Sequence, residues 1–289
     1  FEKSAGWRAY RNLRAQLLRR RFDLLLHMQV SLRANIASLC IPAEVRLGFD
    51  RARARNYQRL FTTYPIDGSP RVHVVDGFFQ FLETAGINDR VMRWDIPLST
   101  ADREFAANQL IGGGPALIIS PCSSQRWRNY RNWSAESYAA VVDYANMHYN
   151  AQVVLTGAQT PMEQAYSERI CELARYKPRN LVGQTTLKRL LALIERAAAV
   201  IAPDSAPAHM ATAVNTPVIG IYATANPKRS GPYLSQQWVV DKYPEAVRLE
   251  FGKSVDDIPW GKRVRNPQAM QLPQVADVTH KLDQLLGSH

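Results

Sequence analysis

Residues 200–233 read VIAPDSAPAHMATAVNTPVIGIYATANPKRSGPY. The opening apolar residues predict a strand. Asp204 and Ser205 are good helix caps, and Pro207 fits a first helical turn, so a helix is expected to begin here. After a break at Asn-Thr-Pro, residues 218–222 form a second apolar run. Strand, loop, helix and strand predict a parallel crossover. Free backbone N–H groups at the helix start suit a phosphate.

The composition is that of a globular protein with a basic surface. The chain has 289 residues, of which 46% are hydrophobic, and this length suits two domains. No apolar run approaches the ~20 residues of a membrane span. Cys40, Cys122 and Cys171 fit neither a disulfide framework nor a zinc site, so we expect reduced thiols in a cytoplasmic protein. The net charge of +11 indicates an anionic partner. Nucleic acid, a membrane surface and a phosphorylated small molecule are all compatible with it.

The rest of the chain also alternates between helical and strand patterns, which predicts an α/β fold. The segment FDLLLHM, residues 22–28, is expected to be a buried strand. The triplet Gly112-Gly113-Gly114 is not a Walker loop, because no strand precedes it and no Lys-Ser/Thr follows it. We interpret it as a flexible domain linker.

Three motifs of the central stretch occur in order: D-S-x-P-A-H at 204–209, A-x-x-x-x-T-P-V-I-G-I-Y at 211–222, and N-P-x-x-x-G-P-Y at 226–233. Together they resemble the lipopolysaccharide heptosyltransferases (glycosyltransferase family 9), most of all the heptosyltransferase I type. The resemblance implies a GT-B fold, with two Rossmann-like domains facing across a cleft. It places the first domain at 1–111, the nucleotide-sugar-binding domain at 112–270, and a C-terminal helix returning to the first domain at 271–289.

The N-terminal part resembles the middle of the family's first domain. Roughly 60 residues of relatives have no counterpart here, by comparison with the family pattern. In relatives the absent segment includes a loop with the proposed catalytic carboxylate. We therefore expect the general base in that segment.

The resemblance also implies a donor site. Relatives have a small polar loop and then Lys or Arg before x-Trp-Pro. Here Arg131-Asn132-Trp133 matches, and a guanidinium pairs well with phosphate oxygens. Gln159 stands where Glu is common, and its amide can bond ribose hydroxyls. The nucleotide-sugar-binding residues expected in this way are Ser123, Ser124, Arg131, Gly157, Gln159, Thr185, Asp204, Ser205, Ala206, Pro207 and His209.

Several of these residues have a structural explanation as well. Arg131 could belong to a basic surface loop, and Arg126 and Arg128 in the same loop stay undecided. Asp204 has the wrong charge for a phosphate, so it either caps the helix or bonds a sugar or ribose hydroxyl. His209 reaches the phosphate or the sugar, or else bonds to backbone.

Acceptor contacts are expected from the first domain. Arg51 and Arg55 lie in a basic, aromatic segment, residues 51–64, that looks like a loop lining a cleft. In relatives a His-x-x-[DE] pattern opens the last helix of this domain, and His73 with Asp76 matches it. His73 is therefore either an acceptor-side residue or a helix-start histidine that bonds its own backbone.

The reaction implied by the resemblance is transfer of heptose from ADP-heptose to the inner core of lipopolysaccharide, with inversion at the anomeric carbon. No Asp-x-Asp loop for a divalent ion is found, since Asp256 and Asp257 are adjacent. We therefore expect no metal and no cofactor, and assign leaving-group stabilisation to Arg131 with helix-start amides. The basic excess suits an anionic acceptor and peripheral contact with the inner face of the inner membrane.

Competing readings of the function remain open. The motifs do not fix the sugar, so a family 9 transferase using another nucleotide sugar is one alternative. A sugar-nucleotide epimerase of the same fold is another. A nucleic-acid-binding protein would interleave basic and aromatic residues, as RWRNYR at 126–131 does, although no nucleic-acid partner is expected.

Overall fold

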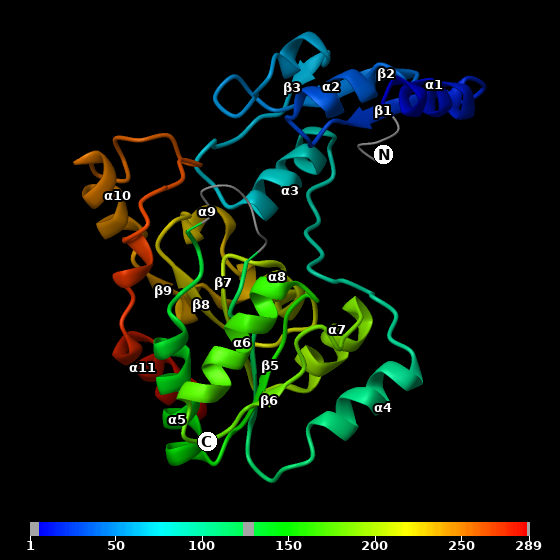
Figure 1. Cartoon of the computed structure of the whole chain (residues 1–289). Helices are drawn as coiled ribbons and strands as arrows, with labels where there is room; N and C mark the ends of the chain where they lie inside the picture. Colours follow the sequence, from blue (N-terminus) through cyan, green and yellow to red (C-terminus); the bar gives the residue numbers. More distant parts are fainter. Residues whose placement is uncertain (1–5, 124–129, 288–289) are drawn as a thin grey trace. The chain divides into compact units, whose positions relative to one another are not determined.

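The computed structural model describes residues 6–123 and 130–287. The chain divides into two compact units, Phe1–Val91 and Met92–His289 (Figure 1). The division lies before the helix α4 (Thr100–Gln109), not at the glycine triplet where the sequence suggested a linker. The reason is that α4 packs on α7 (Leu187–Arg196), with an ion pair between Arg103 and Glu195.

The first unit contains a parallel sheet in the order β1-β2-β3. Its core is small and consists of Leu47, Ile66 and Phe81, with Phe49 packed edge-on against Phe81 at 5.0 Å between ring centroids. Its elements are α1 (Gly6–Leu17), β1 (Phe22–Leu26), α2 (Leu32–Ser38), β2 (Ala43–Gly48), the 3-10 helix η2 (Gln58–Leu60), β3 (Tyr64–Pro65) and α3 (Val74–Thr84).

The expectation that residues 22–28 form a buried strand is wrong for most of the segment. Within the described residues, β1 pairs only with β2, so it is an edge strand. Phe22 and Leu24 are exposed, and burial begins only at His27. The α1 helix, all of it described, likewise has no buried residue.

The second unit contains a six-stranded, fully parallel sheet in the order β6-β5-β4-β7-β8-β9. From β4 the chain moves outward through β5 to β6, returns to the other side of β4 as β7, and continues to β9. The topological switch point therefore lies between β4 and β7, where open α/β sheets bind ligands beyond the carboxyl ends of the strands. The strands are β4 (Ala116–Ile119), β5 (Gln152–Leu155), β6 (Arg179–Asn180), β7 (Ala199–Pro203), β8 (Val218–Tyr222) and β9 (Val240–Asp241).

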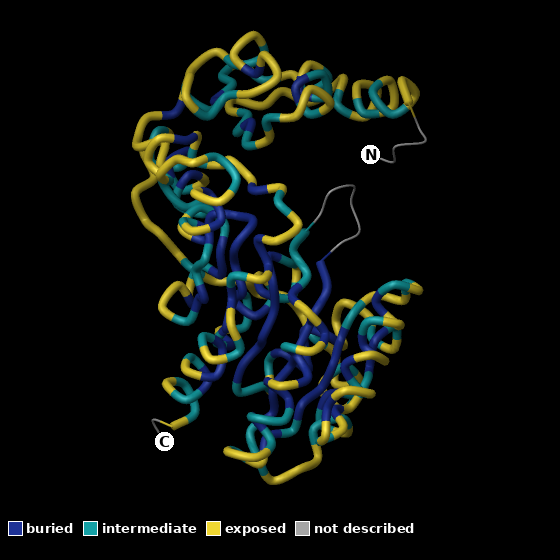
Figure 2. Tube along the Cα trace, turned by 60° about the vertical axis from the view of Figure 1, so that its left-hand side comes forward, coloured by how far each residue is buried: buried dark blue, intermediate teal, exposed yellow. Residues whose placement is uncertain are grey.

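The central strands β4, β7 and β8 are buried on both faces, and Figure 2 shows the buried residues gathered in the middle of the second unit. Along β4, Leu117 and Ile119 belong to one core cluster and Ile118 to the other, as strand alternation requires. One cluster is covered by α5, α6, α10 and α11, and the other by α4, α7 and α8. The helices not yet given are α5 (Ala135–Tyr149), α6 (Pro161–Leu173), α8 (Ala206–Ala213), α9 (Pro227–Ser230), η3 (Tyr233–Trp238), α10 (Tyr243–Phe251), η4 (Ala269–Gln271) and α11 (Val275–Leu286).

The C-terminal helix α11 belongs to the second unit, and its return to the first domain stays a prediction. It packs on α5, where the hydroxyls of Tyr144 and Tyr149 both donate to the carboxylate of Asp283, at 2.9 Å and 2.8 Å. None of the helices in the described part of the chain is long and apolar enough to cross a membrane.

Candidate donor-binding site

A cavity of about 700 Å³ opens at the carboxyl ends of the strands of the second unit. Ile119 of β4 pairs with Leu155 of β5 and with Ile201 of β7, so β4 and β5 end at one level and β7 continues for two more residues. The loops that follow them meet at the cavity. Its lining residues are Ser120, Cys122, Arg131, Thr156, Gly157, Ala158, Gln159, Glu163, Thr185, Thr186, Leu187, Leu190, Asp204, Ser205, Ala206, Pro207, His209 and Met210.

Arg131 and Asp204 face each other across the switch point. Arg131 follows β4, and its Nη1 donates to the backbone oxygen of Asp204 at 2.9 Å and to carboxylate Oδ2 at 3.1 Å. Asp204 follows β7 directly and is buried. The ion pair therefore joins the two loops at the place where the chain's course through the sheet reverses.

The position of Arg131 depends on Trp133, two residues later. Trp133 is buried and packs edge-on against Tyr138 of α5, at 5.2 Å between ring centroids. Its indole Nε1 donates to the backbone oxygen of Pro273 at 2.9 Å. The aromatic residue of the Arg-x-Trp pattern is thus an anchor in the core, and it holds the loop so that Arg131 reaches the cavity.

Asp204 does not cap α8, which removes one of the two roles considered from the sequence. The N-cap of α8 is Ser205, and the Asp204 carboxylate accepts from two guanidinium groups. The second belongs to Arg263, whose Nη1 lies 3.4 Å from Oδ2. Sequence reasoning missed Arg263, because it lies 59 residues beyond Asp204 in a segment without a recognisable motif.

The amino end of α8 faces the cavity through Ser205, Ala206 and Pro207. Ser205 makes no side-chain capping bond, and its Oγ is buried with no hydrogen-bond partner among the described residues. A buried hydroxyl without a partner is costly unless a ligand or water satisfies it. Together with the unpaired N–H groups of a first helical turn, it can bind an anion.

His209 lies one turn into α8 and lines the same cavity. The residue is exposed, yet the protein atoms around the imidazole lower its pKa by desolvation, and the Asp204 carboxylate opposes this shift. A neutral imidazole can both donate and accept hydrogen bonds. The structure therefore brings His209 to the site without fixing which group it contacts.

The first turn of α6, just after the loop that follows β5, has a carboxylate that sequence reasoning did not identify. Glu163 is buried, lines the cavity, and accepts from the backbone N–H of Ala158 through Oε2 at 2.7 Å. A Cβ on Gly157 would lie only 2.6 Å from this Oε2, so the Glu163 carboxylate would have to move if residue 157 had a side chain. The spacing Thr160-x-x-Glu163, a helix-start pattern, was the available signal.

Gln159 and Thr185 also line the cavity, on its β6 side. Gly183, which has a φ of +76°, brings its backbone against Gln159, and its N–H donates to the oxygen of Gly157 at 3.0 Å. Thr186, the residue after Thr185, caps α7 by accepting from the N–H of Arg189 at 3.2 Å.

Ser123 does not line the cavity. It is buried, and its Oγ donates to Oδ1 of Asn132 at 3.1 Å, so its hydroxyl supports the loop that contains Arg131. Ser124, Arg126 and Arg128 lie outside the described residues.

Comparison with known proteins identifies the family. The sequence pattern of glycosyltransferase family 9 (heptosyltransferase) matches residues 10–256. The chain belongs to glycosyltransferase family 9. It is 37% identical over 285 residues to the lipopolysaccharide core heptosyltransferase OpsX of Haemophilus influenzae, covering 99% of this chain and 81% of that protein. It is 28% identical to lipopolysaccharide heptosyltransferase 3 of Escherichia coli, covering 71% of this chain and 60% of that one. The chain is thus a glycosyltransferase, as the motifs suggested.

Solved structures show the same fold. A family 9 glycosyltransferase of Veillonella parvula has a TM-score of 0.72 at 20% identity, covering 97% of this chain and 78% of that one. The Escherichia coli heptosyltransferase WaaC with ADP has a TM-score of 0.68 at 14% identity, covering 99% and 79%. The predicted α/β fold of the GT-B class is confirmed.

The acceptor-side residues predicted for this glycosyltransferase all lie in the first unit. Arg51 and Arg55 are exposed. His73 is the N-cap of α3, and its Nδ1 accepts from the backbone N–H of Val75 at 3.2 Å. His73 is therefore a helix-start histidine that bonds nearby backbone, one of the two roles expected for it. Its contact with an acceptor stays a prediction.

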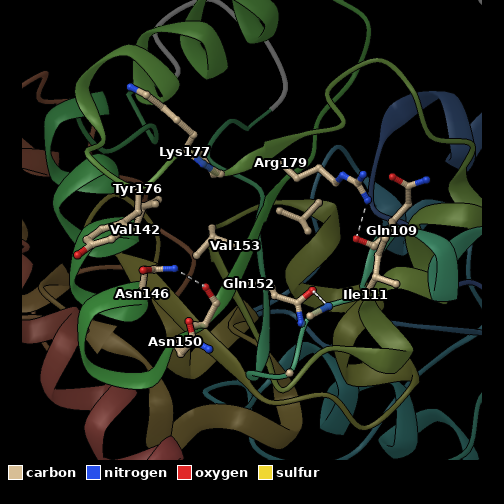
Figure 3. A pocket seen from close by; sticks show the side chains of 15 residues that line it. Gln109, Ile111, Val142, Asn146, Asn150, Gln152, Val153, Tyr176, Lys177 and Arg179 are labelled. Atoms are coloured by element: carbon tan, nitrogen blue, oxygen red, sulfur yellow. Dashed lines mark hydrogen bonds between the residues drawn. The ribbon is translucent and has the colours of Figure 1, made fainter.

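A second cavity, of about 390 Å³, lies near the opposite ends of the strands, where β5 and β6 begin (Figure 3). Several of its polar side chains bond to backbone groups. Arg179 donates to the oxygen of Gln109 at 2.9 Å, and Gln152 accepts from the N–H of Gly112 at 2.7 Å. Lys177, which also lines it, donates to three carbonyl oxygens after Ile170. These side chains stabilise the connections between helices and strands, so this cavity is not our candidate site.

Proposed function

We propose that this glycosyltransferase transfers heptose from ADP-heptose to the inner core of lipopolysaccharide, with inversion at the anomeric carbon and without a metal ion. Two findings support the proposal. The relatives are named as lipopolysaccharide heptosyltransferases, and a structural neighbour was solved with ADP. The observation that carries it is Arg131 opposite the amino end of α8, in a cavity at the switch point.

The nucleotide end of the donor belongs, in this proposal, on the β5–β6 side of the cavity. Gln159 and Thr185 line that side and can bond the base or ribose. We add Glu163 to these residues. Its Oε2 is occupied by the N–H of Ala158, and its second oxygen can accept from a ribose hydroxyl.

The diphosphate belongs between Arg131 and the start of α8. A guanidinium can bond two phosphate oxygens at once, and the N–H groups after Ser205 add a positive helix end. Asp204 and His209 lie next to this position and are assigned to hydroxyls of the sugar. The contact of Ser124 with the diphosphate stays a prediction, whereas the Ser123 hydroxyl bonds to Asn132 and is assigned to support the loop of Arg131.

The proposed chemical step is a single displacement. An acceptor hydroxyl oxygen forms a bond to the anomeric carbon as the bond to the β-phosphate oxygen breaks, and the hydroxyl proton passes to a general base. ADP departs with the bonding electrons, so negative charge grows on the β-phosphate. Groups fixed in advance around that charge lower the barrier. Arg131 is the residue assigned to this task.

The acceptor is assigned to the first unit. Arg51, Arg55 and Arg59 are exposed there, and they suit an acceptor rich in carboxylate and phosphate. Because that acceptor is a membrane lipid, the proposal includes a cytoplasmic enzyme in peripheral contact with the inner face of the inner membrane.

Calorimetric titration with ADP, UDP and GDP tests the donor assignment. ADP should bind most tightly, and Arg131→Ala should weaken ADP binding at least tenfold, because a charged hydrogen-bond partner of the phosphates is lost. Arg179→Ala, at the second cavity, is the matched control and should leave ADP binding unchanged. Preference for UDP or GDP would contradict the heptose donor and favour another nucleotide sugar.

A further inference from the structure

Asp204 is shared by two arginines. Nη1 of Arg131 and Nη1 of Arg263 both approach carboxylate Oδ2, at 3.1 Å and 3.4 Å. Arg131 comes from the loop after β4, whereas Arg263 comes from the segment between α10 and η4. Arg263 lies beyond residues 10–256, the range that matches the family pattern. The family motifs therefore give no role to this second arginine.

The segment on either side of Arg263 is anchored. The backbone oxygen of Lys262 accepts from the hydroxyl of Tyr243 at 2.6 Å. Val264 is buried, and its N–H donates to the backbone oxygen of Thr224, just after β8, at 3.0 Å. With both neighbours fixed, the Arg263 side chain is directed to the carboxylate of Asp204, a residue that lines the cavity, although Arg263 itself does not line it.

The local charge explains why Arg131 alone would not neutralise a bound diphosphate. Arg131 and Asp204 alone form a pair with no net charge. A nucleoside diphosphate has at least two negative charges. If the only ionic groups beside it were the neutral pair of Arg131 and Asp204, the amino end of α8 would be the only net positive group there. Arg263 gives the cluster of Arg131, Asp204 and Arg263 a net charge of +1. Because Asp204 is buried, these charges act on one another through protein and not through bulk water.

The two arginines are not equivalent. The Arg131 side chain is 15% exposed, and a second bond to the Asp204 backbone fixes it. The Arg263 side chain is 44% exposed, and its contact with Oδ2 is longer. Arg263 can therefore leave Asp204 more easily when another anion enters the cavity.

We infer that Arg263 is a second cation of the donor site, which turns from Asp204 to the diphosphate and neutralises charge as the bond to the sugar breaks. This inference rests on the proposed function. The balance of the reaction is unchanged, since Arg263 keeps its proton throughout. Arg131 keeps its assigned role at the β-phosphate, and Arg263 adds a second positive charge whose interaction strengthens as the leaving group becomes more negative.

The test compares Arg263→Ala, Arg263→Lys and the matched control Arg265→Ala, two residues further along the same segment. Steady-state kinetics with ADP-heptose should show kcat reduced about 10²-fold in Arg263→Ala, as for loss of one charge-stabilising donor, with a smaller change in KM. Arg263→Lys should retain an intermediate rate. Added guanidinium ion should restore part of the activity of Arg263→Ala, an effect that a merely structural role would not give.

Calorimetry separates the possible failures. Arg263→Ala should bind AMP as the unaltered enzyme does and ADP about tenfold more weakly, since Arg263 is assigned to the β-phosphate. Activity and ADP binding equal to those of Arg265→Ala would overturn the inference and leave the proposed function standing. An equal loss of AMP and ADP binding with a lowered melting temperature would make Arg263 structural, which also overturns it. Failure of the unaltered enzyme to bind ADP would contradict both proposals.

Discussion

The Nη1 atom of Arg131 donates to both the backbone oxygen and the carboxylate of Asp204, at 2.9 Å and 3.1 Å, and so joins the loops that follow β4 and β7. The two residues are 73 positions apart in the sequence. Their pairing fixes a cation at the switch point of a doubly wound sheet, where this architecture binds ligands. Four predictions follow from this site and from the fold that supports it.

Asp204→Asn should reduce kcat about 10²-fold and leave ADP affinity within a few-fold of its original value. The carboxylate orients Arg131 and is assigned to a sugar hydroxyl, and an amide does both less well, but both arginines remain to bind ADP. Steady-state kinetics and ADP titration measure the two effects. Asp23→Asn, an exposed carboxylate in β1, is the control. A large loss of ADP affinity with unchanged kcat would contradict this role.

Gly157→Ala should destabilise the fold by about 1–3 kcal/mol and weaken nucleotide binding. The new Cβ would lie 2.6 Å from Oε2 of Glu163 and would break the bond of 2.7 Å to the N–H of Ala158. Urea unfolding and ADP titration are the measurements. For Gly113→Ala, the matched control, a Cβ meets nothing within 4 Å in the described part of the chain, so little change is expected. Equal stabilities of the two variants would refute the close approach.

Acid should destabilise the fold through His27. Burial lowers the pKa of His27, the charge of Arg46 adds to the shift, and the hydrogen bond to Asn35 opposes it. Below the usual pKa of about 6.5 the unfolded chain binds a proton that the folded chain resists, so stability falls as the pH decreases from there. Urea unfolding at pH 7.5 and pH 5 should show a smaller loss for His27→Gln. If the free energy of unfolding of His27→Gln decreased between pH 7.5 and pH 5 as much as that of the unaltered chain, His27 would not be the cause of the acid sensitivity.

Tyr57→Asn should stabilise the fold by about 1 kcal/mol. Tyr57 has a φ of +62°, a left-handed conformation that is costly for a bulky residue and tolerated by asparagine. Because the Tyr57 side chain is 76% exposed, little packing is lost. Thermal unfolding measures the gain. Tyr64→Asn, in β3 and also exposed, should give no stabilisation, and an equal gain there would point to a cause other than backbone strain.

Much of the second unit could be predicted from the sequence because its signals are local. Apolar strands of four or five residues, followed by capped helices, predict a parallel sheet without knowledge of any distant contact. The crossover β7-α8-β8 was predicted in this way, and it is confirmed. Arg131, Asp204 and His209 were found through motifs, and the structure brings them to one cavity.

What was missed depends on contacts between distant residues. The packing of α4 on α7, which includes the ion pair between Arg103 and Glu195, 92 positions apart, places α4 in the second unit. Arg263 reaches Asp204 from another distant segment. The exposure of β1 depends on which strands lie beside it, and its apolar sequence alone does not reveal this.

The most direct test of the proposed activity is a transfer assay with ADP-heptose and a lipopolysaccharide acceptor that lacks the heptose. We predict that ADP is released only when both substrates are present, that mass spectrometry shows the acceptor heavier by one heptose, and that Arg131→Ala abolishes both signals. Two results would contradict heptose transfer. One is release of ADP without acceptor, and the other is an acceptor that stays unmodified with unaltered enzyme that binds ADP.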